Sequence, residues 1–352
     1  MKISIKALSS YSVLTTVVFL IYVYPINILQ YLITGQVQSY YLSLFETLVS
    51  VSIITFYFRT STTLPLLKLF SHEGLALGFI SFWVLNIALI TEKFSQLESK
   101  IIGYISITLI CLLFVFSYIS TLFIVTKKLS FQSNKVSRDY CLALISDIHL
   151  GSNGQKHLQR LVNKINKINA ETVLICGDLI DSSSFDLSKL ILLQSIQVPK
   201  YFVTGNHEHY LKNLNETIDS LKKHQLITIN NTSILFEELN IIGISDNLSF
   251  KEKQQYVKRL TCNDRFNICL VHQPSIWEQI RDDVDLMFSG HTHRGQIFPF
   301  NFFVRLRFKY IYGHYKHKSS NLIVSSGAGT WGPKVRLGSF NEIIELNIQA
   351  IK

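Results

Sequence analysis

The sequence predicts four transmembrane helices followed by one α/β domain, in which two stacked β-sheets are flanked by helices. Four long apolar stretches lie within the first 126 of the 352 residues, and a membrane-spanning helix needs about 20 mostly apolar residues. After residue 139, short apolar runs alternate with amphipathic segments and then follow one another closely, which is typical of βαβ units joined to hairpins. We therefore expect a membrane domain at 1–126, a basic juxtamembrane linker at 127–138 and a soluble domain at 139–352.

The four apolar stretches are 11–33, 40–58, 74–90 and 101–126. A buried core of a soluble protein is the alternative, but apolar runs this long and this poor in charge favour a membrane. The first stretch is too long for the apolar region of a signal peptide, and three more stretches follow it. We expect Pro25 to kink the first helix, which a transmembrane helix tolerates. Glu46 is the one carboxylate inside a span, and we expect it near the membrane interface.

The basic residues outside the spans predict an orientation. The chain has a net charge of +10, and positive loops remain on the cytoplasmic side of a membrane. One side would hold only Lys93 and Lys100, which Glu92 and Glu98 offset. We therefore expect a multi-pass protein of the inner (cytoplasmic) membrane whose termini and soluble domain face the cytoplasm, with segment 127–138 lying along the lipid headgroups. The cytoplasmic side would hold Lys2, Lys6, Arg59, Lys68, Lys127, Lys128, Lys135 and Arg138.

The soluble domain is predicted from the spacing of its apolar residues. Apolar residues at helical spacing between two apolar runs indicate a βαβ unit at the start of the domain. Later runs are shorter and closer together, which favours hairpins. The predicted helices are 154–169, 185–196, 211–224 and 250–260. The predicted strands are 140–146, 172–176, 200–204, 227–229, 233–236, 239–244, 266–271, 295–299, 322–325 and 342–348.

Five apolar runs of this domain end in Asp, Asn or His, and in open α/β sheets that edge binds ligands. Each residue has a plain alternative: Asp147, Asp178 and Asp181 could cap turns or helices, His272 could be a core histidine, and a His-x-His pair could lie on the surface. Their occurrence together favours a metal site. The candidate ligands are Asp147, His149, Asp178, Asn206, His272, His291 and His293.

Seven ligands are too many for one ion but suit two ions that share a carboxylate. Oxygen ligands mixed with imidazoles suit Mn, Fe, Zn or Mg better than a thiolate-binding metal. Two metals about 3.5–4 Å apart can hold the attacking and leaving oxygens of a phosphoryl transfer and lower the pKa of a bound water. The pattern therefore indicates a two-metal phosphoryl-transfer site.

The order of these motifs resembles that of the calcineurin-like metallophosphoesterases. The resemblance covers 141–347, and segment 327–338 (GAGTWGPKVRLG) resembles the membrane-anchored bacterial branch, which includes UDP-2,3-diacylglucosamine hydrolase-like members. The motifs are Asp147-x-His149, Gly177-Asp178-x-x-Asp181, Gly205-Asn206-His207-Glu208, His272 and Gly290-His291-Thr292-His293.

The resemblance implies a role for each matching residue. His207 would bind no metal, and would protonate the leaving oxygen or stabilise the transition state. Arg294 stands where this branch often has Gly, and Arg294 and Arg336 are candidates for contacting substrate. Manganese is the expected metal, with Fe, Zn or Mg as alternatives. The first ion would bind Asp147, His149, Asp178 and His293, and the second would bind Asp178, Asn206, His272 and His291.

The implied activity is metal-dependent hydrolysis of a phosphoester or pyrophosphate bond, with a lipid-linked substrate such as UDP-2,3-diacylglucosamine. Segment 299–318 mixes aromatic and basic residues, which favours either the lipid interface or a loop with an edge strand. Nucleic acid is not expected as a partner, and no oligomeric state is predicted. The alternatives are a phosphatase or phosphodiesterase acting on phospholipids or other phosphoesters, and a non-catalytic membrane receptor or scaffold. The complete ligand set and His207 argue against the receptor.

Overall fold

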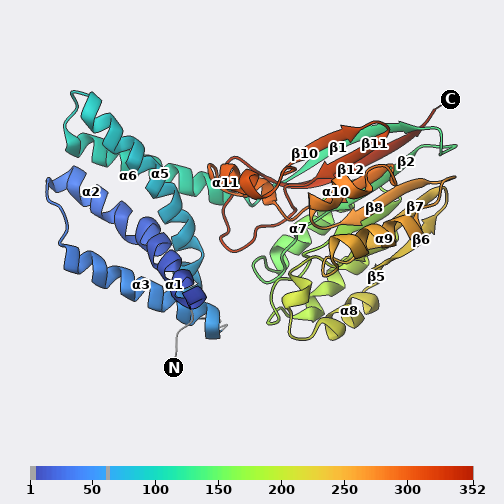
Figure 1. Ribbon diagram of the computed structural model, residues 1–352, viewed down its shortest axis with the longest axis horizontal. Coiled ribbons are helices and arrows are strands. Elements are labelled where there is room, and N and C mark those ends of the chain that lie inside the picture. The colour runs from blue at the N-terminus through green and yellow to red at the C-terminus, as the bar shows by residue number, and fades with distance from the viewer. Residues whose placement is uncertain (1–4, 61–63, 352) are drawn as a thin grey trace. The chain divides into compact units, whose positions relative to one another are not determined.

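The computed structural model describes residues 5–60 and 64–351, and side-chain surroundings from residue 11 onward (Figure 1). Lys2 and the side chain of Lys6, which enter the orientation argument, lie outside the described residues. The chain divides into two compact units. These are Met1–Ile119 with Pro333–Val335, and Ser120–Gly332 with Arg336–Lys352.

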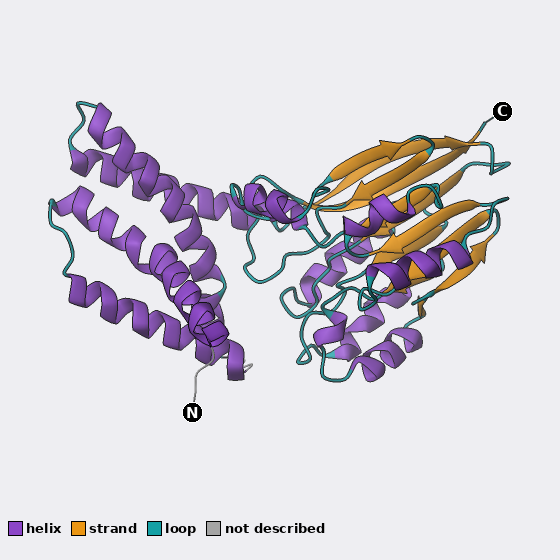
Figure 2. Ribbon diagram, viewed as in Figure 1, coloured by secondary structure: helices purple, strands orange, loops and turns teal. Residues whose placement is uncertain are grey.

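The first unit is helical (Figure 2). Four of its segments are long and apolar enough to cross a membrane: Tyr11–Thr34, Tyr40–Thr60, Pro65–Phe94 and Ser99–Ser120. Each overlaps one predicted stretch, although the third begins earlier and the fourth ends at Ser120 rather than at residue 126. The elements are α1 (Ile5–Val18), η1 (Phe19–Val23), α2 (Tyr24–Thr34), α3 (Tyr40–Thr60), α4 (Pro65–Ser71), α5 (Glu73–Phe94) and α6 (Ser99–Ser120).

The irregularity expected at Pro25 takes the form of a π-helical turn, η1. The N–H of Tyr24 bonds to the carbonyl of Phe19, five residues back. Pro25 has no N–H, so the carbonyl of Ile21 loses the donor that an α-helix would supply. Gly78 of α5 lies against this carbonyl, and a Cβ at that position would collide with it. The small residue therefore lets the two helices approach closely at the irregular turn.

Polar side chains of α2 join it to two other helices of the first unit. Hydrogen bonds of this kind help to hold membrane helices together. Glu46, expected near an interface, accepts a hydrogen bond of 2.7 Å from Gln38, which lies just before α3. The bonds from α2 run from Tyr24 to Asn86 (3.0 Å), from Asn27 to Ser43 (2.9 Å) and from Tyr31 to Glu92 (3.2 Å).

The second unit confirms the predicted pair of stacked sheets flanked by helices. Each sheet has six strands, in the orders β1-β12-β2-β3-β4-β5 and β10-β11-β9-β8-β7-β6. Leu144 and Leu174 of the first sheet pack with Ile268 and Phe288 of the second in a shared core. The strands of the first sheet are β1 (Ile124–Ser133), β2 (Tyr140–Ile145), β3 (Thr172–Cys176), β4 (Lys200–Val203), β5 (Leu226–Thr228) and β12 (Asn341–Ala350). Those of the second are β6 (Thr232–Phe236), β7 (Leu239–Ile244), β8 (Phe266–Val271), β9 (Leu286–Ser289), β10 (Gly313–His317) and β11 (Ser320–Val324).

Helices cover the outer faces of both sheets. Leu158 and Leu161 of α7 pack against Val173 of β3. On the other side, Val257 of α9 and Trp277 of α10 pack in the cluster that includes Ile242 of β7. The helical elements are α7 (Gln155–Ile165), η2 (Leu187–Ser195), η3 (Glu208–Tyr210), α8 (Leu214–Lys223), α9 (Phe250–Leu260), η4 (Pro274–Ile276), α10 (Trp277–Ile280), η5 (His293–Gly295) and α11 (Phe300–Arg307).

The structure corrects the predicted linker. Residues 124–133 form β1, which pairs in parallel with β12 over ten positions, beginning with Ile124 opposite Asn341. Leu129 and Phe131 pack against the core between the sheets, whereas Lys128 forms an ion pair of 2.9 Å with Glu345 of β12. Basic residues that alternate with apolar ones therefore mark a half-buried strand here rather than a segment along the headgroups.

Two other predictions were wrong in detail. The expected strand at 295–299 is instead the short turn η5 and a single bridge between Ile297 and Leu337. Gly295, which has a φ of 79°, and the following Pro299 explain the lack of a strand. The expected α-helix at 185–196 is the 3₁₀-helix η2.

Candidate metal centre

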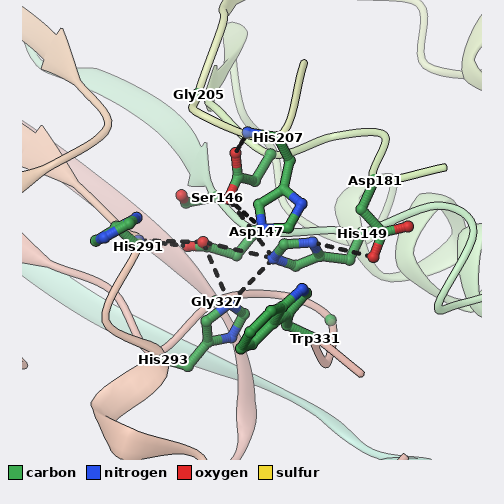
Figure 3. A network of polar contacts seen from close by, with 12 residues as sticks. Ser146, Asp147, His149, Asp181, Gly205, His207, His291, His293, Gly327 and Trp331 are labelled. Carbon is green, nitrogen blue, oxygen red and sulfur yellow. Dashed lines mark hydrogen bonds and ion pairs between the residues drawn. The ribbon is translucent and has the colours of Figure 1, made fainter. Parts of the chain in front are cut away.

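Five strands deliver the seven predicted ligands to one place. Asp147 and His149 follow β2, Asp178 follows β3, and Asn206 follows β4. In the second sheet, His272 follows β8 directly, and His291 and His293 follow β9. Because β2, β3 and β4 are parallel, as are β8 and β9, their carboxyl ends lie at common edges. Figure 3 shows side chains from both sheets converging there.

The backbone of this region is strained. Asp147, His149, Asp178, His291 and His293 all have positive φ values, between 48° and 71°. Such values cost residues other than glycine on the order of 1–3 kcal/mol each, and they gather at functional sites where the surroundings hold them in place. The concentration of strain at five of the seven candidate ligands therefore indicates that function shapes this region.

One group of donor atoms consists of Asp147, His149 and His293. The Nε2 atoms of the two imidazoles lie 3.0 Å apart. Oδ1 of Asp147 lies 3.4 Å from Nε2 of His293 and 3.8 Å from Nε2 of His149. All three side chains are buried. The nitrogens and the carboxylate oxygen therefore face a common point, as ligands of one ion do.

A second group consists of Asp178, His272 and His291. Nδ1 of His272 lies 2.9 Å from the carbonyl oxygen of Cys176, to which it donates a hydrogen bond. Its Nε2 is buried without a hydrogen-bond partner among the described residues, 3.0 Å from Oδ2 of Asp178. Asn206 joins this group, because its Oδ1 lies 2.8 Å from Nδ1 of His291.

The arrangement of His272 tests whether the residues suit a metal ion. A metal-ligating histidine donates its second N–H to a carbonyl or carboxylate, which fixes the tautomer. His272 does this with Cys176, so in its neutral form the ring directs a lone pair at the carboxylate of Asp178. Two acceptors this close are unfavourable unless a cation or an additional proton lies between them. Together with the first group, this arrangement fits two divalent ions.

Charges within the centre shift its pKa values. Burial alone would raise the pKa of Asp147, but the imidazoles of His293, His149 and His272 hold it well below its usual range. The pKa of His149 is raised to about 10, because the carboxylates of Asp147, Asp181 and Asp178 outweigh the effect of burial. Burial, assisted by His272, lowers the pKa of His291 to about 4. The metal-free centre therefore combines anionic carboxylates with a neutral imidazole at His291 and a charged imidazole at His149.

Glu208 holds two of the ligand loops in place. Its carboxylate accepts hydrogen bonds from the backbone N–H groups of Asp178 (2.9 Å), Ile180 (2.9 Å) and Gly205 (2.8 Å). The side chain is buried, and burial together with the nearby Asp178 raises its pKa to about 7. The sequence showed Glu208 only as part of a motif, because its partners are backbone groups that no residue pattern reveals.

His207 lies beside the two groups. The backbone N–H of His207 donates a hydrogen bond to Oδ1 of Asp178 (2.9 Å), and Nε2 of its ring lies 3.9 Å from Oδ2 of Asp178. The ring makes edge contacts with Tyr210 and Trp331, at centroid distances of 5.6 and 5.8 Å. Burial lowers the pKa of His207. His207 also forms a third possible donor group with His149 and Asp178, so its exclusion from the ligands stays a prediction.

The side chain of Arg336, a predicted substrate contact, is fully buried. Its Nη2 donates to the carbonyls of Ser326 and Gly329, both at 2.6 Å, and its Nη1 donates to Ser339 Oγ. Nη2 also lies 3.3 Å from Nδ1 of His293. The guanidinium therefore packs behind a candidate ligand, and a contact between Arg336 and substrate stays a prediction.

The other predicted substrate contact, Arg294, is half-buried, and its guanidinium lies 4.3 Å from the ring centre of Tyr312. A contact between Arg294 and substrate stays a prediction.

Two residues near the centre have roles that the sequence did not reveal. Asp181 does not cap η2, since Asp186 does so. Its carboxylate lies 3.3 Å from Nδ1 of His149 and accepts hydrogen bonds from Ser152, which suits a residue that orients a ligand. Its spacing of three from Asp178 was the available signal. Trp331 reaches His207 from a distant loop (Figure 3).

The fold and this donor set define the class of two-metal phosphoesterases. The calcineurin-like phosphoesterase family model matches residues 142–295. A protein from Campylobacter jejuni described as an uncharacterized metallophosphoesterase is 35% identical over 64% of this chain and 63% of its own length. The cattle transmembrane protein with metallophosphoesterase domain is 30% identical over 59% of this chain and 53% of its own length. The protein YpbG of Bacillus subtilis is 30% identical over 55% of this chain and 75% of its own length.

This chain belongs to the calcineurin-like phosphoesterase family. It spans between about half and just under two thirds of the length of the first relatives that it matches. The family and the two donor groups together imply a two-metal site.

Proposed function

We propose that this protein is a membrane-anchored phosphoesterase with two divalent ions, which hydrolyses a phosphoester or pyrophosphate bond of a lipid-linked substrate. The observation that carries the proposal is the convergence of two buried donor groups around Asp178 and Asp147. Two metals suit phosphoryl transfer because they stabilise the charge on both the attacking and the leaving oxygen. A receptor or scaffold has no need of such a complete and strained ligand set.

We assign the first ion to Asp147, His149, Asp178 and His293, and the second to Asp178, Asn206, His272 and His291. The short distance from Asp178 Oδ2 to His272 Nε2, 3.0 Å, supports a place for Asp178 in the second set. The distance of 3.8 Å from the same oxygen to His149 Nε2 supports its place in the first. We propose manganese as the native metal, because mixed oxygen and imidazole ligands suit it.

His207 is the proposed proton donor. The leaving oxygen of a phosphoester needs a proton or a hydrogen-bond donor, and general acid help contributes about 10²–10⁴-fold to the rate. The hydrogen bond from the backbone N–H of His207 to Asp178 fixes the backbone at this position. Contacts with Trp331 and Tyr210 restrict the orientation of the His207 ring. This side chain remains 17% exposed, so a substrate oxygen can reach it.

The proposed substrate is a lipid that carries its phosphate at the bilayer surface, and UDP-2,3-diacylglucosamine is the most specific candidate. The four candidate spans support this proposal, because they keep the domain at a membrane. The proposed orientation places the domain in the cytoplasm, where the positive-inside rule puts the more basic side of the chain.

A substrate panel tests the proposal. Full-length protein in nanodiscs is loaded with Mn²⁺ and given UDP-2,3-diacylglucosamine, phosphatidic acid, and a water-soluble aryl phosphodiester. We expect metal-dependent hydrolysis, with kcat/KM at least about tenfold higher for the lipid-linked pyrophosphate than for the aryl ester, because remote binding energy aids catalysis. Asp178→Asn is the inactive control. Protein that binds two ions but cleaves no member of the panel contradicts the proposal and favours a receptor.

A further inference from the structure

The second unit carries an exposed apolar and basic surface on α11. None of the residues of this helix is buried within the described part of the chain. Phe302, Phe303 and Leu306 are 55%, 49% and 86% exposed, and they alternate with the exposed Arg305 and Arg307. Water-facing helices of soluble domains rarely group large apolar side chains in this way, and such groups mark surfaces that bind a partner.

This surface is continuous with the mouth of the metal centre. Trp331 is 56% exposed, and two hydrogen bonds to Gln296, of 3.1 and 3.0 Å, hold its backbone beside the turn that precedes α11. The ring of Trp331 contacts His207. At the other end of α11, Phe308 packs against His291 at a centroid distance of 5.2 Å. Whatever binds the surface therefore lies next to the site.

The register of the first sheet shows where the chain enters the domain. Thr126 of β1 lies opposite Ile343 of β12, and Ile344 lies opposite Leu144 of β2. The beginning of β1 is therefore at the same sheet edge as the end of β2, which leads into Asp147. Three residues separate this strand from the end of the last candidate span at Ser120, a reach of at most about 14 Å.

We propose that the surface formed by Phe302, Phe303, Leu306, Trp331, Arg305 and Arg307 binds the anionic headgroups of the bilayer to which the chain is tethered. Aromatic rings lie at the interface between lipid and water, and each basic residue near an anionic surface strengthens binding about fivefold. The short connection to the last span keeps a bilayer within reach of this edge. The surface holds the metal centre at the level of lipid phosphates, and its binding does not depend on which bond the site cleaves.

Fluorescence quenching in nanodiscs tests the proposal directly. The chain has three tryptophans: Trp277 is buried in the domain, and a Trp83→Phe background removes the one in a candidate span. Full-length protein is placed in phosphatidylcholine nanodiscs, with or without phosphatidylglycerol, that contain lipid with a doxyl group near the headgroup. We expect quenching of Trp331 that strengthens with phosphatidylglycerol. Trp331 emission that is independent of doxyl lipid overturns the proposal.

Paired variants identify the residues responsible. Arg305→Gln with Arg307→Gln should remove the dependence on phosphatidylglycerol, and Phe302→Ser with Leu306→Ser should weaken quenching in every nanodisc. Leu235→Ser, at a position on the edge strand β6 that is 57% exposed, is the matched control and should change nothing. Unchanged quenching in both pairs contradicts the proposal. So does a change in oligomeric mass with unchanged quenching, which makes the surface an interface between copies of the chain.

The quenching measurement is independent of turnover. Trp331 quenching without hydrolysis of any lipid supports the membrane surface and rejects the proposed enzyme. Hydrolysis of lipid without Trp331 quenching supports the proposed enzyme and rejects the membrane-binding surface. If both hold, the α11 variants should lower the rate on lipid-embedded substrate about tenfold or more while leaving the rate on the soluble aryl ester unchanged.

Discussion

Asp178 is the residue on which both donor groups meet. Its carboxylate faces His272 and His149, and its backbone is held by Glu208. We predict that Asp178→Ala loses both ions, because a bridging ligand contributes to each site. Metal analysis of purified full-length protein measures this. Asp186→Ala, which removes the N-cap of η2, is the control and should keep two ions per chain. Two ions retained in Asp178→Ala would show that the carboxylate does not bridge them.

A variant of His207 distinguishes a role in catalysis from a role as a metal ligand. We predict that His207→Ala keeps both ions and the melting temperature but slows hydrolysis by about 10²–10⁴-fold, because the leaving oxygen loses its proton donor. The loss should be largest for substrates with poor leaving groups. Rates on aryl esters of graded leaving-group pKa, together with metal content, measure this. Loss of an ion would instead make His207 a ligand, as its proximity to His149 and Asp178 allows.

The raised pKa of His149 predicts a proton release. With a pKa of about 10, this imidazole is charged at neutral pH in the metal-free protein, and it must lose its proton before it can bind an ion. Metal affinity should therefore fall as the pH falls. Calorimetric titration with Mn²⁺ in two buffers of different ionisation enthalpy measures the release, which should decrease in Asp181→Asn. Binding heats that are the same in both buffers contradict the prediction.

At the scale of elements, Gly78 shows how the irregular first span is accommodated. Its lack of a Cβ allows α5 to pack on the carbonyl of Ile21. We predict that Gly78→Val destabilises the helical unit by about 1–3 kcal/mol, since overpacking forces backbone shifts. Thermal unfolding in detergent, followed by Trp83 fluorescence, measures the change. Leu77→Ala, at an exposed position on the same helix, should have little effect, and equal losses in both variants would argue against a specific contact.

Most of the elements, and the convergence of the seven candidate ligands at one place, could be predicted because their signals are local. The short apolar runs of the second unit form buried strands. A polar residue just after a parallel strand lies at the ligand-binding edge, whatever the conformation of the loops. His272 is an example, since the preceding strand alone determined its position.

The errors have a different physical origin, because they concern residues whose environment is set by distant parts of the chain. The pattern around Lys128 suits both a headgroup-binding segment and an edge strand, and only pairing with Glu345 of β12 decides between them. The burial of Arg336 was not predicted either, because it depends on the loop carbonyls of Ser326 and Gly329, which accept hydrogen bonds from its guanidinium. No local pattern encodes these hydrogen bonds, and a glycine-rich segment with an arginine suits a substrate loop equally well.

At the scale of the whole molecule, the distribution of basic residues predicts which side of the membrane the domain faces. Eight basic residues on one side against two on the other predict that the C-terminus lies in the cytoplasm. A reporter fused to the C-terminus should therefore have cytoplasmic activity. Charge reversal tests the cause: Lys127→Glu with Lys128→Glu should reduce the fraction in this orientation, whereas Lys258→Glu, within α9, should not. External reporter activity in the parent protein would reject the orientation and any substrate confined to the cytoplasm.

The pairing of β1 with β12 also affects how the protein is made. During synthesis, β1 leaves the ribosome long before β12, its partner in the sheet. Until β12 has been synthesised, β1 and β2 both lack the neighbour that lies between them in the native sheet. Unpaired strand edges of this kind invite association with other chains. The first sheet of the nascent domain therefore stays incomplete until β12 has been synthesised, and misfolding and chaperone binding would act in this interval.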